Sequence, residues 1–224
     1  MFWGINLGGG WVARGALLAA LCFGFGCSSE SGEPPAPTNT LSSARAAETS
    51  STVSFSLSKW LDAEGLEKAA VTGSFRGVTV SLDEASRANL RAGDLAGVNA
   101  EIAVDLNSLD TGMEIRNTNV KEAFFDTALF TTAVVRVLGL QATDVPGVYS
   151  AKLELSIHGV TGDLANAKLS LEKLDGGYRA HTLEPIGIVS ANFNLGVAAL
   201  LQRCQHKGLD PVALIQADVF VADP

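Results

Sequence analysis

The sequence is short of cysteine, and this shortage excludes one way of stabilising a fold. Three cysteines occur in 224 residues. Cys22 and Cys27 both stand near the N-terminus, so Cys204 has no second cysteine in the body of the chain. A framework of disulfides is therefore excluded, and the fold must depend on its hydrophobic core.

Basic clusters are also missing. The formal net charge is −8, and lysine and arginine are scattered along the sequence. Binding to nucleic acid requires a basic footprint that offsets the phosphate charge, so we expect no nucleic-acid partner. The same acidity disfavours contact with anionic lipid surfaces, and attachment to a membrane would need another source.

Catalytic motifs are a third absence. The chain has no G-x-S-x-G, H-E-x-x-H or C-x-x-C motif, no P-loop and no G-x-G-x-x-G after a strand. The segment Cys204-Gln-His206 offers two candidate metal ligands, without a carboxylate at ligand spacing. We therefore expect a protein that is not an enzyme and that holds no metal or cofactor. An enzyme would need a serine or a pair of carboxylates that converge in a pocket.

Residues 1–26 have the features of a secretory signal. They contain no acidic residue and a single basic one, and they include the apolar run Ala16 to Phe25. A run of roughly ten residues is too short to cross a bilayer core of about 30 Å as a helix. Small Gly26 before Cys27 is typical of lipoprotein processing, although Gly24 stands where leucine is usual. We predict that Cys27 carries a lipid anchor; the alternative is an ordinary cleaved signal that leaves a free thiol.

Residues 28–50 are rich in Ser, Pro, Thr, Glu and Ala and have almost no large apolar side chain. Such a segment cannot bury enough surface to offset the entropy of ordering. The predicted organisation is a lipoprotein signal peptide over 1–26, an acylated disordered tether over 27–50 and one folded domain over 51–224. Serine after Cys27 resembles the signal for export to the outer membrane of Gram-negative bacteria. The expected location is therefore the cell envelope, on its periplasmic or its outer face.

The residue pattern of the folded domain predicts mainly β-strands. Apolar and polar residues alternate cleanly in Val53–Ser58, Ala100–Leu106 and Tyr149–His158. Further strand candidates are 70–82, 132–140, 165–174, 178–189 and 212–221. Two segments have apolar spacings nearer the helical period, 113–125 and 195–207, with Asn194 as a candidate N-cap for the second. Eight or so strands joined by short turns predict an all-β antiparallel barrel or sandwich with one or two short helices.

Three short motifs resemble the YceI-like family. The first runs from Ser108-Leu-Asp-Thr-Gly112 through Arg116 to Phe124-Phe125-Asp126, the second is His158-Gly-Val-Thr161, and the third contains Asn192-Phe193. The resemblance implies a lipocalin-like antiparallel barrel of secreted bacterial proteins that hold polyisoprenoids or other long-chain lipids. The chain departs from the family pattern at Asn117, at Asn119-Val120 and at Ser190, where a histidine and an arginine are missing. A neutral lipid or a quinone is therefore as plausible a ligand as a prenyl pyrophosphate.

The sequence also indicates space inside such a barrel, because many of its apparent core positions are small. An eight-stranded barrel is either filled by its own side chains or wide enough for one elongated ligand. The positions that we expect to leave room are Ala70, Val71, Ala100, Val104, Ala133, Val135, Ala151, Ala165, Ala167, Ala213 and Ala217. The alternative is that these residues only permit tight packing of the strands.

The candidate ligand-binding residues are Arg116, Asn119, Phe124, Phe125, His158 and Phe193. Arg116 would pair with a headgroup or, alternatively, with a nearby carboxylate such as Asp126. His158 ends a strand and is more commonly a hydrogen-bonded hairpin residue. We predict a membrane-anchored lipid-binding protein whose ligand, of polyisoprenoid, quinone or fatty-acyl type, serves storage or transfer. The alternative is a solid barrel that acts as a structural or interaction module of the envelope.

Overall fold

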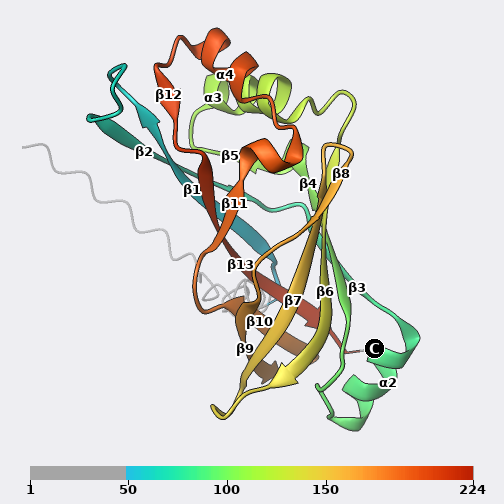
Figure 1. The fold of residues 1–224 in the computed structure, drawn as a ribbon. Coiled ribbons are helices and arrows are strands. Elements are labelled where there is room, and N and C mark those ends of the chain that lie inside the picture. The colour runs from blue at the N-terminus through green and yellow to red at the C-terminus, as the bar shows by residue number, and fades with distance from the viewer. Residues whose placement is uncertain (1–48, 224) are drawn as a thin grey trace, which may run out of the picture. The chain divides into compact units, whose positions relative to one another are not determined.

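The computed structural model describes residues 49–223, and a single antiparallel sheet dominates them (Figure 1). Its strands are β1 (Thr52–Trp60), β2 (Lys68–Phe75), β3 (Val78–Leu82), β4 (Ala100–Asp105), β5 (Leu109–Asp110), β6 (Thr132–Ala142), β7 (Val148–Ile157), β8 (Val160–Asp163), β9 (Ala167–Leu174), β10 (Gly177–Thr182), β11 (Ile186–Val189), β12 (Gly208–Leu209) and β13 (Val212–Ala222). The helices are α2 (Glu84–Ala92), α3 (Glu114–Asn119) and α4 (Val197–Cys204), with short 3₁₀ turns η1 (Leu106–Ser108) and η3 (Ser190–Phe193) and a π-helical turn η2 (Val120–Phe125). Cys27, the predicted signal peptide and nearly all of the predicted tether lie outside the described residues.

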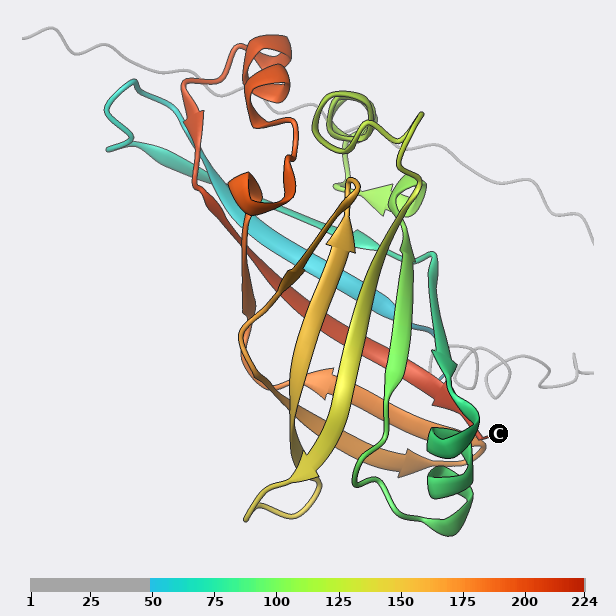
Figure 2. The same ribbon diagram turned by 45° about the vertical axis from the view of Figure 1, so that its right-hand side comes forward.

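The strand order along the sheet is β3-β4-β6-β7-β9-β10-β13-β1-β2-β5, and β8, β11 and β12 pair with β7, β13 and β1. All of these pairs are antiparallel. The sheet curls so that β4, β6 and β7 face β1 and β13 across an interior (Figure 2). Such curling follows from the right-handed twist of strands.

The two edges of the curled sheet are joined by the chain itself. β2 pairs with β1 at one edge and β3 pairs with β4 at the other, and only Arg76 and Gly77 separate β2 from β3. This bend is held by η1, because Gly77 N donates to Ser108 Oγ (2.9 Å) and Asp105 N donates to the Gly77 carbonyl (2.7 Å). A Cβ on Gly77 would lie 2.9 Å from Asp105 Cβ, so this close approach favours glycine. Counted with β2 and β3 as one bent strand, the eight long strands confirm the predicted barrel.

The crossing from β4 to the helices is pinned by polar side chains of the first motif. Asn117 is buried, and its Oδ1 accepts hydrogen bonds from Thr111 N (2.8 Å) and Thr111 Oγ1 (2.7 Å). Asp110 Oδ1 accepts from Gly112 N (2.8 Å), which closes the turn between them. A buried amide with its carbonyl satisfied twice stabilises one path of the backbone, because leaving it unpaired would be unfavourable.

Short helices lie at both ends of the sheet. α3, η2 and α4 lie at one end and α2 lies at the other (Figure 1). Helix α2 was not predicted, and it brings the number of α-helices in residues 49–223 to three instead of one or two. Asp83 caps its first turn by accepting from Ser86 N (2.7 Å), and Gly93 ends it in the left-handed conformation.

The start of α4 also differs from its expected place. We expected Asn194 as its N-cap, but α4 begins at Val197 after Gly196, and Asn194 ends η3 with a positive φ of 52°. Asparagine tolerates the left-handed region better than most residues, which explains its position at this turn. Within residues 49–223, no helix is both long enough and apolar enough to cross a membrane.

Candidate functional site

The interior of the curled sheet contains two apolar cavities that adjoin one another. Their volumes are about 160 Å³ and about 120 Å³, and each is several times the roughly 15 Å³ that a water molecule needs. Five residues line both cavities and mark the narrow waist between them: Val53, Val104, Val135, Ile188 and Ile215. The two cavities therefore lie next to each other in the interior of the barrel, with these five side chains between them.

Strand alternation explains why the walls are apolar. In β1, Val53, Phe55, Leu57 and Lys59 all line the first cavity, because side chains two apart on a strand share a face. In β13, the same rule places alternate residues from Ala213 to Val221 on the walls. The regularity of both strands therefore fixes which side chains surround the space.

Small side chains create the space, as the sequence predicted for most positions. Seven of the expected positions line a cavity: Val71, Ala100, Val104, Ala133, Val135, Ala213 and Ala217. Ala151 and Ala167 are buried without lining either cavity. The expectation was wrong for Ala70 and Ala165, which are exposed. Ala165 precedes β9, so the alternation of that strand does not govern it.

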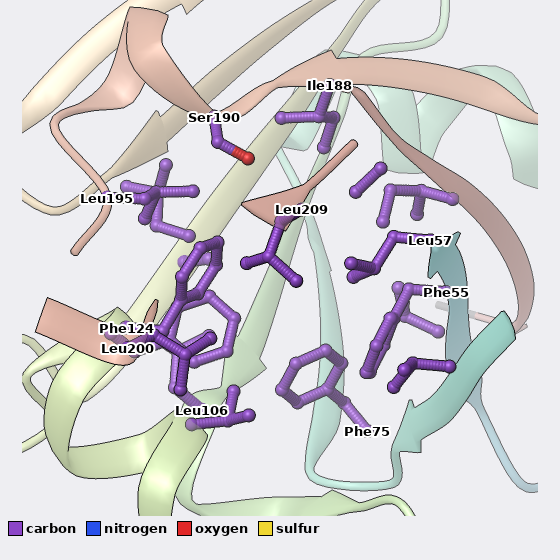
Figure 3. Close-up of a pocket in the computed structure, with 18 of the residues that line it drawn as sticks. Phe55, Leu57, Phe75, Leu106, Phe124, Ile188, Ser190, Leu195, Leu200 and Leu209 are labelled. Carbon is purple, nitrogen blue, oxygen red and sulfur yellow. The ribbon is translucent and has the colours of Figure 1, made fainter. Parts of the chain in front are cut away.

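The first cavity ends against a cap made of η2 and α4. Phe124 and Phe125 both line the cavity, with ring centroids 5.0 Å apart and nearly perpendicular rings (Figure 3). Phe75 packs against Phe125 at 5.9 Å between centroids, so an aromatic cluster covers this wall. Leu195 and Leu200 complete the apolar surface from the side of α4.

A close backbone contact also joins the two parts of the cap. Gly196 N donates to the Phe124 carbonyl (2.9 Å), and a Cβ on Gly196 would lie 2.0 Å from the Ala123 carbonyl oxygen. Only glycine fits at this approach without movement of the backbone. An ion pair between Arg203 and Glu122 (2.6 Å) joins α4 to η2 on the outside, and it is partly exposed.

The polar residues of the first cavity gather at the capped end. They are Lys59, Arg116, Ser190, Cys204, His206 and Asp210, contributed by β1, α3, η3, α4 and the turn around β12. The rest of the wall is almost entirely hydrocarbon. Such a distribution, an apolar tunnel with polar groups at one end, suits an amphiphile that enters tail first.

Two of these polar residues already have partners. Asp210 Oδ1 accepts from Lys68 Nζ (2.6 Å) and Trp60 Nε1 (3.0 Å), and these bonds hold the pKa of Asp210 below its usual value. Cys204 Sγ accepts a long hydrogen bond from Asn119 Nδ2 (3.4 Å).

Half of the predicted site residues lie on the cavity wall. Arg116, Phe124 and Phe125 line the first cavity. Asn119 does not line the cavity itself, but it donates a hydrogen bond to Cys204, which does.

The other two predicted site residues lie away from both cavities. His158 forms the hairpin between β7 and β8 with a positive φ of 52°, and its ring contacts Phe130 in a tilted arrangement with 4.2 Å between ring centroids. Phe193 is buried in η3 against Gly162. The predicted anchor residue Cys27 belongs to the part of the chain that the structure does not describe.

Lys59 and His206 also line the first cavity, and neither was among the predicted site residues. Lys59 carried a signal, because it continues the inward alternation of Val53, Phe55 and Leu57 on the same strand. His206 carried none, since it follows α4 and reaches the cavity only through the path of that loop.

Comparison with known proteins gives one family and one fold. The model of the YceI-like domain family matches residues 45–209. No curated protein matches the chain.

Solved structures share the fold at low identity. One is a polyisoprenoid-binding domain from Saccharophagus degradans implicated in plant cell wall breakdown, with a TM-score of 0.61 and 21% identity over 78% of this chain and 94% of that one. Another is BcnA from Burkholderia cenocepacia, with a TM-score of 0.58 and 17% identity over 77% and 96% of the two chains. A YCEI protein from Campylobacter jejuni has a TM-score of 0.51 and 13% identity over 71% and 88%.

Proposed function

Because this chain belongs to the YceI-like domain family, we propose that it binds a long apolar ligand inside its curled sheet. The observation that carries the proposal is the pair of adjoining apolar cavities, which together would hold an elongated ligand. Each methylene that leaves water for such a space contributes about 0.8 kcal/mol. A chain of roughly sixteen carbons would gain on the order of 10 kcal/mol before the losses of translational and conformational freedom are subtracted.

A solid barrel with its partner on the outer surface is the competing function. That function would need side chains to fill the centre, as they do in small barrels without a ligand. Cavities of about 160 Å³ and 120 Å³ favour the carrier, because native cores contain few voids larger than a water molecule.

The ligand class that we propose is a single-chain lipid of polyisoprenoid, quinone or fatty-acyl type. The Saccharophagus degradans structure is described as a polyisoprenoid-binding domain, and its fold is shared by this chain. The walls carry no ring of inward polar groups along the tunnel that would select a polar chain. The role that we propose for holding such a lipid is its storage or transfer.

We further propose that the protein is an exported lipoprotein of the cell envelope, anchored through Cys27. The support is the sequence of residues 1–29, which has a short apolar run and a small residue before the cysteine. Metabolic labelling with an alkyne fatty acid tests this proposal. Label should attach to the wild type and to Cys204→Ser but not to Cys27→Ser, and equal labelling of all three would contradict it.

The carrier function is tested by identifying the lipid that copurifies with the protein. The full chain is purified from its source membrane, denatured and extracted, and the extract is analysed by lipid mass spectrometry. We expect about one molecule of a single-chain lipid per protein, in excess of the covalent anchor. An extract without any stoichiometric lipid, together with failure of the delipidated protein to bind a fluorescent polyene fatty acid, would refute the carrier function.

A further inference from the structure

Three basic side chains converge at the capped end of the first cavity. Lys59 comes from the end of β1, Arg116 from α3 and His206 from the loop after α4, and all three line the cavity wall. They are separated by long stretches of sequence, so only the fold brings them together. All three are half-buried.

The two cations also affect the ionisation of His206. Burial lowers the pKa of His206 below its usual value, and the positive charges of Lys59 and Arg116 lower it further. The lowered pKa favours the neutral imidazole at pH 7, which keeps one ring N–H as a donor.

Among the described residues, no carboxylate forms an ion pair with Lys59 or Arg116. The Arg116 guanidinium donates a hydrogen bond from Nη2 to Met113 Sδ (3.0 Å). A thioether sulfur is a weak acceptor, so the donors of Arg116 remain available to a stronger one. This contrasts with Arg136, which binds the carboxylates of Glu101 and Glu154.

The one carboxylate on the same cavity wall does not neutralise them. Asp210 is bound to Lys68 at 2.6 Å and to Trp60 at 3.0 Å. Its charge is therefore compensated by a lysine that does not line the cavity. Lys59 and Arg116 are left as uncompensated positive charge at the end of an apolar tunnel.

We infer that Lys59, Arg116 and His206 form a headgroup site for the oxyanion of a single-chain lipid, either a carboxylate or a phosphate ester. The inference rests on the proposed carrier function and adds the charge of the ligand to it. A guanidinium and an ammonium supply several N–H donors for the oxygens, and the neutral imidazole supplies one more. The tail of the same lipid then occupies the tunnel behind the aromatic cluster.

The competing explanation is that the long basic side chains only cover the cavity with their hydrocarbon stems. Lysine and arginine commonly do so while the charged end stays in water. In that case the headgroup of the lipid would not affect the affinity. The two explanations differ in one measurable quantity, the difference in affinity between a charged and an uncharged lipid with the same tail.

The experiment uses dodecanol, laurate and dodecyl phosphate, which share one tail and differ in their headgroups. Each is titrated by calorimetry, below its critical micelle concentration, into the delipidated full chain and into the variants Lys59→Gln and Arg116→Gln. Lys168→Gln, which removes an exposed charge from β9 away from both cavities, is the matched control. Circular dichroism and thermal melting verify that each variant is folded.

For the wild type we expect at least one of the two anions to bind about tenfold more tightly than dodecanol, as expected for a partly desolvated charged hydrogen bond. Lys59→Gln and Arg116→Gln should each remove most of this preference and leave dodecanol unchanged, and Lys168→Gln should change neither. The anion that shows the larger preference identifies the headgroup as a carboxylate or a phosphate ester.

Two results would overturn the inference, and they are distinguishable. Equal affinities of all three lipids for the wild type would show that the headgroup site does not exist while the carrier function stands. The same conclusion follows if the Lys59 and Arg116 variants weaken dodecanol as much as the anions. Failure of all three lipids to bind would refute the carrier function and the headgroup site together.

Discussion

Filling the waist between the two cavities should block ligand binding without unfolding the protein. Val135 stands at this waist on β6, and its cross-strand neighbours are Ile102 on β4 and Leu155 on β7. The substitution Val135→Phe places a ring in the space that a lipid tail would need in order to pass from one cavity to the other.

The expected magnitude follows from the volume that the ring takes up. Phenylalanine adds about four carbon atoms to valine, and each methylene of the ligand that is displaced loses about 0.8 kcal/mol. The loss of about 3 kcal/mol corresponds to a decrease in affinity of roughly a hundredfold. Stability should change by less than about 2 kcal/mol, because the strain of added carbons is offset by filling a void that already exists.

Titration with a fluorescent polyene fatty acid measures the affinity, and chemical denaturation measures the stability. Leu138→Phe is the matched control, because it places the same ring on the outer face of the same strand, where Leu138 is 36% exposed. We expect the control to bind like the wild type. If Val135→Phe also bound like the wild type while remaining folded, the ligand would not pass the waist, and the single elongated site would be refuted.

Three further predictions concern the cap and its surroundings. Phe125→Ala should lower the free energy of unfolding by about 3–5 kcal/mol in chemical denaturation, because the ring is buried against Phe75; an unchanged midpoint would show that it does not contribute to the core. Gly196→Ala should lower the melting temperature, because its Cβ would meet a carbonyl oxygen at 2.0 Å, and an unchanged melting temperature would contradict the close contact of α4 with η2. The pKa of Asp210 is lowered, so its contribution to stability is present above the unfolded pKa of about 3.9 and is lost as the pH falls through the folded pKa. Asp210→Asn should therefore lose less stability on acidification below about pH 5 than the wild type does, and parallel stability curves would contradict this.

The barrel was predictable because its signal is local. Val53–Ser58 and Tyr149–His158 alternate strictly, and a period of two cannot be accommodated by a helix with one buried face. Helix α2 was missed because its apolar residues are few, and its boundaries are marked by the capping residues Asp83 and Gly93 rather than by an apolar stripe. These capping residues predict α2 when they are given as much weight as the apolar periodicity.

The candidate site was only partly predictable, because its polar end is assembled from distant segments. Phe124 and Phe125 were expected to bind the ligand because they end the first motif, which lies in one continuous segment of the sequence. The position of His206 depends on how α4 turns back over the sheet, and nothing in the neighbouring sequence reports that path. The alternation of β1 predicts that Lys59 lies on the inward face. A lysine after a series of apolar residues is nevertheless easily interpreted as the end of the strand.

The residues that carry the family resemblance mainly hold the backbone in this structure. Ser108 fixes the bend between β2 and β3, Asp110 closes the turn at Gly112, and His158 turns a hairpin. The proposed headgroup contacts, in contrast, come largely from Lys59 and His206, which belong to none of the three motifs. The motifs would then fix the path of the backbone. Changes in a few side chains at the mouth of the barrel would leave that backbone intact and would let the same fold accept different headgroups. The resemblance is therefore a firmer guide to the fold and to the presence of an apolar space than to the charge of the lipid that occupies it.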